Sequence, residues 1–206
     1  MGEINLDELT DMQFDVLKEI GNIGAGNATT ALSQMMNLKI DMSVPNVALI
    51  PITEIAGMIG SEETIVVGIL LGMEGDVKGM MMFLFTEKSA HTIVSTLLGM
   101  EIDTTAQIGE MEFSALSEIG NIIAGAYLSA LSSLTNLTVF PTVPALTIDM
   151  AGAILSVPAI EYGKIGDKVL FIETNLGEDD SLSGYIVMVP ELESYGKILT
   201  SLGIQV

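Results

Sequence analysis

The sequence predicts an α+β fold, in which one mainly antiparallel sheet of six strands carries two long helices packed on it. Three observations lead to this prediction. Residues 13–45 align with residues 112–144 without a gap, and 16 of the 33 positions are identical. Each copy begins with apolar residues at helical spacing and continues into apolar runs separated by turn residues. Hydrophobic residues make up 49% of the 206-residue chain, enough for a substantial core.

The opening helix of each half is predicted from apolar residues three positions apart, which form a core-facing stripe. The stripe residues are Phe14, Leu17 and Ile20 in the first half and Phe113, Leu116 and Ile119 in the second. The helices are expected to span about residues 11–37 and 110–136.

Three strands and a closing helix are predicted to follow each long helix, because pairs of apolar runs around Gly- and Asp-containing turns indicate hairpins. The strands are expected near residues 38–50, 63–73, 77–86, 137–149, 167–175 and 182–190. The short stretches 53–60 and 150–157 are expected to form a helical turn between strands. The closing helices, within 86–100 and 190–204, end at a Leu-Gly pair in which Gly is the expected C-cap.

The pseudo-two-fold repeat of α-β-β-β-α units covers nearly the whole chain, approximately residues 1–101 and 105–206. The only candidate linker, residues 101–109, is too short to separate independent domains. We therefore expect one domain.

Composition excludes several classes of function. The formal net charge is −20 and all seven cationic residues are Lys, which argues against nucleic-acid binding. There is no Cys for a disulfide or thiolate site, and the single histidine, His91, is expected on the surface. No apolar run reaches the roughly 18 residues of a membrane span, and the acidic N-terminus is unlike a signal peptide. We expect a cytoplasmic protein without membrane insertion.

A polar triplet recurs on the two long helices. Asp15, Glu19 and Asn22 follow at i, i+4 and i+7, and Ser114, Glu118 and Asn121 repeat the spacing. Residues so spaced share one helix face, here opposite the apolar stripe and hence exposed.

Gly21 and Gly120 lie between the acid and the amide of each copy. A glycine inside a helix costs about 1 kcal/mol relative to Ala. We expect compensation from the close approach of another backbone or of a partner surface.

A carboxylate and an amide one turn apart have no neighbouring nucleophile to activate and form a poor metal site. An amide can hold and aim a water molecule, because it donates and accepts hydrogen bonds at once. Phosphoryl transfer depends mainly on positioning and charge stabilisation. The pair therefore fits half of an active site that another protein completes, while the alternative of solvated surface side chains stays open.

The chain resembles the CheC/CheX/FliY family. The resemblance rests on a pattern of Asp or Ser, three residues, Glu, two residues, Asn, twenty-two residues and Pro. It is met by Asp15, Glu19, Asn22 and Pro45, and again by Ser114, Glu118, Asn121 and Pro144. Two intact copies are typical of the CheC branch.

The resemblance implies a phosphatase acting on the phospho-aspartate of the response regulator CheY. Asn22 and Asn121 would position the attacking water, and Glu19 and Glu118 would pair with the regulator's active-site Lys. The chain would have no cofactor of its own, since the regulator would supply Mg²⁺. Asp15 and Ser114 would lie at the edge of the partner-binding footprint, and Pro45 and Pro144 would be structural.

The family also implies a second partner, the receptor deamidase CheD. The candidate surface is Asp149 with residues 150–157, an apolar stretch of small residues that could instead be a buried connection. The alternative function is thus an adaptor that binds and regulates CheD in response to CheY-P, with weak phosphatase activity.

Overall fold

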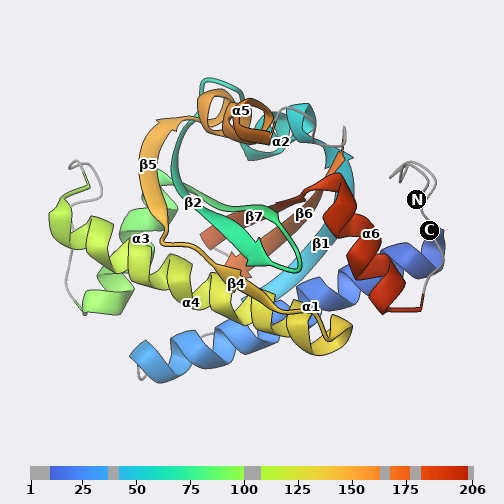
Figure 1. Ribbon diagram of the computed structural model, residues 1–206. Coiled ribbons are helices and arrows are strands. Elements are labelled where there is room, and N and C mark those ends of the chain that lie inside the picture. Colours follow the sequence, from blue (N-terminus) through green and yellow to red (C-terminus); the bar gives the residue numbers. More distant parts are fainter. Residues whose placement is uncertain (1–9, 37–41, 100–107, 163–167, 177–181, 204–206) are drawn as a thin grey trace.

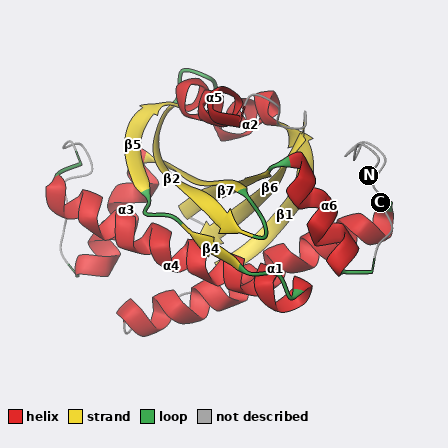
Figure 2. Cartoon of the chain, in the orientation of Figure 1, coloured by secondary structure: helices red, strands yellow, loops and turns green. Residues whose placement is uncertain are grey.

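The computed structural model describes residues 10–36, 42–99, 108–162, 168–176 and 182–203, which form six helices and seven strands (Figure 2). The helices are α1 (Asp11–Met36), α2 (Ile52–Ile59), α3 (Glu87–Leu98), α4 (Glu110–Thr135), α5 (Ala151–Tyr162) and α6 (Leu192–Ser201). The strands are β1 (Met42–Pro51), β2 (Ile65–Gly75), β3 (Gly79–Thr86), β4 (Val139–Pro141), β5 (Ala145–Met150), β6 (Lys168–Leu176) and β7 (Leu182–Pro190).

The elements form three layers around one antiparallel sheet of order β1-β6-β7-β3-β2-β4, in which β5 also pairs with β2. The long helices α1 and α4 pack against each other on one face, where α3 and α6 also join the core. Helices α2 and α5 cover the opposite face (Figure 1).

Strand β3 is buried on both sides, and its side chains alternate between the two layers. Met81, Phe83 and Phe85 join the core beneath the long helices. Met82 and Leu84 join the core beneath α2 and α5. The near-continuous apolar character of this strand therefore comes from helices on both faces.

The two halves of the chain interleave in the sheet. Strand β1 of the first half pairs with β6 of the second, and β5 of the second half pairs with β2 of the first. The halves meet at the central β3–β7 ladder, where Gly79 pairs with Pro190 and Phe85 pairs with Gly184. Since Gly79 and Gly184 occupy equivalent places before the apolar run of each strand, the ladder follows the internal repeat.

The predicted α+β fold is confirmed, with differences in detail. The strand predicted over 137–149 is divided into β4 and β5, so the sheet has seven strands. The division falls between Pro141 and Pro144, since proline lacks the N–H that a continuous ladder needs. Between them, Thr142 uses its hydroxyl to accept a hydrogen bond from the Gly72 N–H at 2.8 Å.

The two predicted helical turns are complete helices, α2 and α5. Their apolar side chains, including Ile55 of α2 and Ile154 of α5, are buried against the sheet. Helix α2 nearly coincides with the expected stretch 53–60, whereas α5 continues to Tyr162, beyond the expected end at residue 157.

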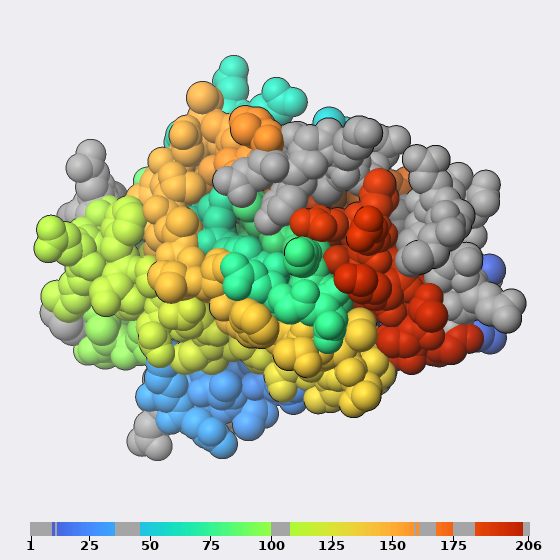
Figure 3. All heavy atoms as spheres, viewed as in Figure 1, coloured from blue at the N-terminus to red at the C-terminus, as the bar shows by residue number. Residues whose placement is uncertain are grey.

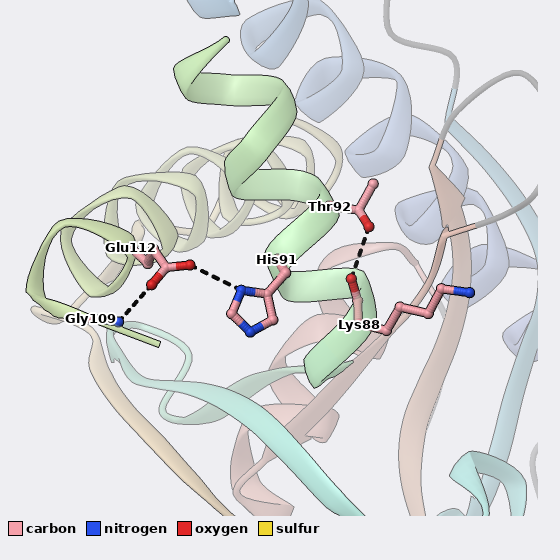
Figure 4. A network of polar contacts seen from close by, with 5 residues as sticks. All are labelled: Lys88, His91, Thr92, Gly109 and Glu112. Carbon is pink, nitrogen blue, oxygen red and sulfur yellow. Dashed lines mark hydrogen bonds and ion pairs between the residues drawn. The ribbon is translucent and has the colours of Figure 1, made fainter. Parts of the chain in front are cut away.

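The expected surface position of His91 is wrong, because its side chain is only 1% exposed. It lies on the inner face of α3 beside the buried residues Ala90 and Val94. Its Nδ1 atom is 3.0 Å from Oε1 of Glu112 on α4 (Figure 4).

Candidate functional site

The two polar triplets lie on the outer faces of α1 and α4, as predicted. All six side chains are exposed: Asp15, Glu19, Asn22, Ser114, Glu118 and Asn121. The stripe residues Leu17, Ile20, Leu116 and Ile119 are buried against the sheet, whereas Phe14 and Phe113 are half-buried. The periodicity of the sequence therefore assigned the inner and outer faces of both helices correctly.

The glycines between acid and amide let each long helix lie close to the sheet of its own chain. A Cβ atom on Gly21 would be 3.3 Å from Cγ2 of Val47, and one on Gly120 would be 2.6 Å from Cγ2 of Ile69. The expected compensation from another backbone or a partner surface is thus wrong. Side chains of the sheet explain both glycines, which bring the helices carrying the triplets down onto the strands.

Contacts between α1 and α4 hold the two triplets in a fixed relation. Gly24 of α1 faces the ring of Tyr127 of α4, and a Cβ atom on Gly24 would lie 2.7 Å from Cγ of that ring. The Tyr127 side chain is completely buried, and burial raises the pKa of its phenol above the usual range. The two helices adjoin at the base of the space-filling view, α1 in blue and α4 in lime to yellow (Figure 3).

The acid and the amide of each copy are free to engage a partner. Within the described ranges, Glu19, Asn22, Glu118 and Asn121 make no side-chain hydrogen bond or ion pair. A carboxylate can pair with an incoming cation, and an amide can donate to one group while accepting from another. Each helix face therefore presents a carboxylate and an amide at its surface.

The described part of the chain offers no group of three or more His, Asp or Glu side chains that could hold a metal ion. None of its helices combines the length and the apolar character needed to span a membrane.

The two motif prolines differ in their surroundings. Pro45 lies in β1 at an irregularity of register between Ser43 and Asn46. Pro144 is the residue before β5. Both occur where pairing along the strand is interrupted, as a missing N–H requires.

Asp149 is exposed near the end of β5, two residues before the first residue of α5. Its Oδ1 atom accepts a hydrogen bond from the Met150 N–H at 2.7 Å. In the stretch 150–157 that follows, Ala151, Ile154 and Leu155 are buried in the core. Most of the apolar side chains in this stretch therefore face the sheet, as in the buried alternative.

Comparison with known proteins agrees with the duplicated pattern. The profile described as the CheC-like family matches residues 12–49 and 111–148, which are each long helix and the strands after it. The CheY-P phosphatase CheC of Bacillus subtilis is 36% identical over 200 residues, covering 95% of this chain and 96% of that protein. The chain belongs to the CheC-like family. The putative CheY-P phosphatase CheC1 of Halobacterium salinarum is 20% identical over 190 residues, covering 92% of this chain and 96% of that protein.

Solved structures related to the CheC-like family share the fold. FliY of Thermotoga maritima superposes with a TM-score of 0.76 at 20% identity, over 95% of this chain and 98% of that one. One chain of a CheX-CheY-BeF3-Mg²⁺ complex from Borrelia burgdorferi superposes with a TM-score of 0.53 at 20% identity, over 82% of this chain and 96% of that one. These structures confirm the fold, and the sequence matches to the CheC-like family and to the Bacillus subtilis relative confirm the predicted family resemblance.

The sequence reasoning overlooked four further residues on the same helix faces. Met12 and Met111 are exposed large apolar side chains, and Gly26 and Gly125 have open space above them. The internal repeat was the signal that could have found them, because both pairs are separated by the same 99 positions as the motif.

Proposed function

We propose that this protein is a phosphatase that hydrolyses the acyl phosphate of the response regulator CheY-P. One observation carries the proposal: two exposed Glu–Asn pairs, whose side chains bond to no other described residue, occupy equivalent faces of α1 and α4. The family supports it, since the Bacillus subtilis relative is named a CheY-P phosphatase. The proposed activity places the protein in the cytoplasm with its regulator.

In this mechanism the chain orients the regulator and positions the water molecule, and the regulator supplies the phosphoryl group and the metal. Glu19 or Glu118 pairs with the active-site Lys of CheY and sets the orientation of the complex. The amide of Asn22 or Asn121 then holds a water molecule in line with the phosphorus atom. Asp15 and Ser114, one turn earlier on each helix, contact the edge of the partner.

The water oxygen forms the new bond to phosphorus as the bond to the aspartyl oxygen breaks. The electron pair of that bond stays on the regulator's carboxylate, and the phosphoryl group leaves as inorganic phosphate, H2PO4⁻, which carries the oxygen and both protons of the water. The regulator would hold Mg²⁺, which would neutralise charge on the phosphoryl oxygens. A correctly placed water accounts for most of the required acceleration, because phosphoryl transfer needs little covalent help from the protein.

The name of the Borrelia burgdorferi complex supports CheY as the partner, since it joins CheX, a fold neighbour, to CheY with BeF3 and Mg²⁺. It also supports a reaction in which the metal belongs to the complex with the regulator.

The test is the decay of phosphorylated CheY with wild type, Asn22→Ala, Asn121→Ala and the double variant. Wild type is expected to accelerate decay, each single variant to lose part of the effect, and the double variant to lose all of it. Asn27→Ala is the matched control, because Asn27 is an exposed asparagine of α1 outside the triplet face. If the double variant accelerates decay as much as wild type does, these amides are not the groups that position the water.

A second candidate function is an adaptor for the deamidase CheD, regulated by CheY-P. Its supporting observation is an exposed patch remote from the triplets: Asp149 and Met150 end β5, and Met150 pairs with the exposed Ile65. An exposed surface that combines acidic and apolar side chains is more typical of a protein-binding site than of a solvated surface. In a CheD-binding measurement, Asp149→Lys should weaken the complex, while the Asn22/Asn121 double variant should bind normally.

A further inference from the structure

Gly26 and Gly125 occupy equivalent positions on the long helices, and no contact within the chain explains why either residue is glycine. A Cβ atom on Gly26 or on Gly125 would meet no atom within 4 Å outside its own helix neighbourhood. This differs from Gly21, Gly24 and Gly120, where a Cβ atom would contact the sheet or the facing helix. Packing within the chain therefore does not require glycine at Gly26 or Gly125.

Backbone conformation does not require it either. Both residues lie within regular helices, and neither has a positive φ. Glycine is among the least favourable residues in a helix interior, because it loses the most backbone freedom there. Glycine occupies both copies of this position, which is exposed at Gly26 and half-buried at Gly125, and this points to a requirement outside the chain.

The two glycines lie within the face that carries the proposed site. Gly26 follows Glu19 by seven residues and Asn22 by four, and Gly125 has the same relation to Glu118 and Asn121. At 3.6 residues per turn these spacings leave the residues on one side of the helix. The glycine therefore lies one turn beyond the water-positioning amide.

At the other end of the same face each copy has an exposed methionine. Met12 is 73% exposed and Met111 is 60% exposed, and each precedes the first triplet residue by three positions. Methionine is flexible and polarizable, which suits an adaptable protein contact. We call the set of five residues on each helix the docking stripe: Met12, Asp15, Glu19, Asn22 and Gly26, and Met111, Ser114, Glu118, Asn121 and Gly125. Each stripe is about 21 Å long.

We propose that Gly26 and Gly125 are specificity-determining positions, at which the bare helix backbone admits a surface segment of phosphorylated CheY. The methionine at the opposite end anchors the regulator by apolar contact. Because the docking stripe is continuous with the Glu–Asn pair, this inference rests on the proposed function and commits to the same partner.

The geometry explains why a side chain at the glycine would matter. A side chain there would stand between the regulator and the helix, one turn from the amide that holds the water. Misplacement by about 1 Å is enough to lower a reaction rate roughly a hundredfold. The absence of a side chain at the glycine therefore determines how closely the phosphoryl group approaches the amide.

A size series tests the proposal with two double variants, G26A/G125A and G26Q/G125Q, and with Gly57→Ala and Gly57→Gln as controls. Gly57 lies in α2, on the opposite face of the sheet, and a Cβ atom there also meets nothing within 4 Å. Four quantities are measured: the denaturant midpoint, the KM and kcat for decay of phosphorylated CheY, and the Kd for CheY activated with beryllofluoride and Mg²⁺.

All the variants are expected to have raised denaturant midpoints, because Ala and Gln are better helix formers than Gly. The docking-stripe variants should nevertheless raise KM and Kd, about threefold or more for Ala and tenfold or more for Gln. The Gly57 variants should leave both constants unchanged. If the docking-stripe variants are more stable than wild type but bind more weakly, and Gln weakens binding more than Ala, a structural defect does not explain the loss of binding.

The outcomes separate this inference from the proposed function. If the Asn22/Asn121 double variant is inactive but both glycine double variants keep wild-type KM and Kd, the inference is overturned and the phosphatase stands. If wild type binds activated CheY without hydrolysing its phosphate, and the glycine variants bind weakly, the docking role holds and the phosphatase fails. If wild type does not bind activated CheY, both are overturned.

Discussion

The carboxylate of Glu112 in α4 contacts His91 of α3 and also caps the N-terminus of α4. Nδ1 of His91 lies 3.0 Å from Oε1 of Glu112, and Oε2 of Glu112 accepts the Gly109 N–H at 2.6 Å (Figure 4). The Glu112 side chain is 14% exposed. The first turn of α4 is thereby fixed to α3 just before Ser114, the first triplet residue of the second half.

Replacing His91 should destabilise the protein. In His91→Leu, Oε1 of Glu112 loses its partner while the side chain remains largely buried, so we expect a loss of about 1–3 kcal/mol in the free energy of unfolding. Chemical denaturation measures it. Thr92→Ala is the control, since among the described residues its hydroxyl bonds only to the Lys88 carbonyl of the same helix, and a change below about 0.5 kcal/mol is expected. Equal midpoints for His91→Leu and wild type would contradict a stabilising contact.

Gly24→Ala should destabilise the pair of long helices. The added methyl group would overlap the buried ring of Tyr127, and overpacking of this kind costs about 1–3 kcal/mol. The matched control is Gly26→Ala, two positions along the same helix, where open space lets the better helix former stabilise by up to about 1 kcal/mol. Thermal unfolding of the two variants should therefore move in opposite directions, and a shift of the same sign would refute the assignment of their environments.

Alkaline pH should weaken the fold through its buried tyrosines. Burial raises the pKa of Tyr127 and of Tyr195, whereas in the unfolded chain a Tyr ionises near pH 10. Stability that depends on the neutral phenols is complete below about pH 10. It falls above that pH by about 1.4 kcal/mol per pH unit for each phenol, because the unfolded chain releases protons that the folded chain keeps.

The Tyr127→Phe variant isolates one of these groups. Within the described ranges the Tyr127 hydroxyl has no hydrogen-bond partner, so its removal should be nearly neutral at pH 7. Denaturant unfolding at pH 8, 10 and 11 should then give a shallower alkaline loss for Tyr127→Phe than for wild type. Parallel losses would show that this phenol is not the titrating group.

Association with the regulator should depend on ionic strength. At a formal net charge of −20, the protein repels an acidic partner over long range, and salt screens that repulsion. With a regulator of negative net charge, the association rate should rise severalfold between about 10 mM and 150 mM salt. Stopped-flow mixing measures the rate, and a rate that falls with salt would indicate attraction between locally complementary surfaces instead.

Much of the architecture was predictable because the repeat and the helical period are encoded locally. The buried positions Leu17, Ile20, Leu116 and Ile119 follow from spacing alone, as does the exposure of both triplets. The family pattern then placed the candidate site on those faces.

Other features depend on contacts between distant segments, which spacing does not encode. His91 is polar by type, but its burial follows from a partner 21 positions later. The division between β4 and β5 and the exchange of outer strands between the halves likewise depend on tertiary pairing. The open space above Gly26 cannot be distinguished from the crowded space above Gly24 until the second long helix is in place.

The exchange of strands also has a consequence for the origin of the molecule. Neither half, with these pairings, can complete its own sheet: β2 and β6 each take an outer neighbour from the opposite half, and β3 and β7 take each other. A single-copy ancestor built in the same way would have closed its sheet only as a strand-exchanged homodimer. Fusion of two such genes would turn that obligate dimer into one polypeptide, after which the two triplet faces could diverge, as Asp15 and Ser114 already have.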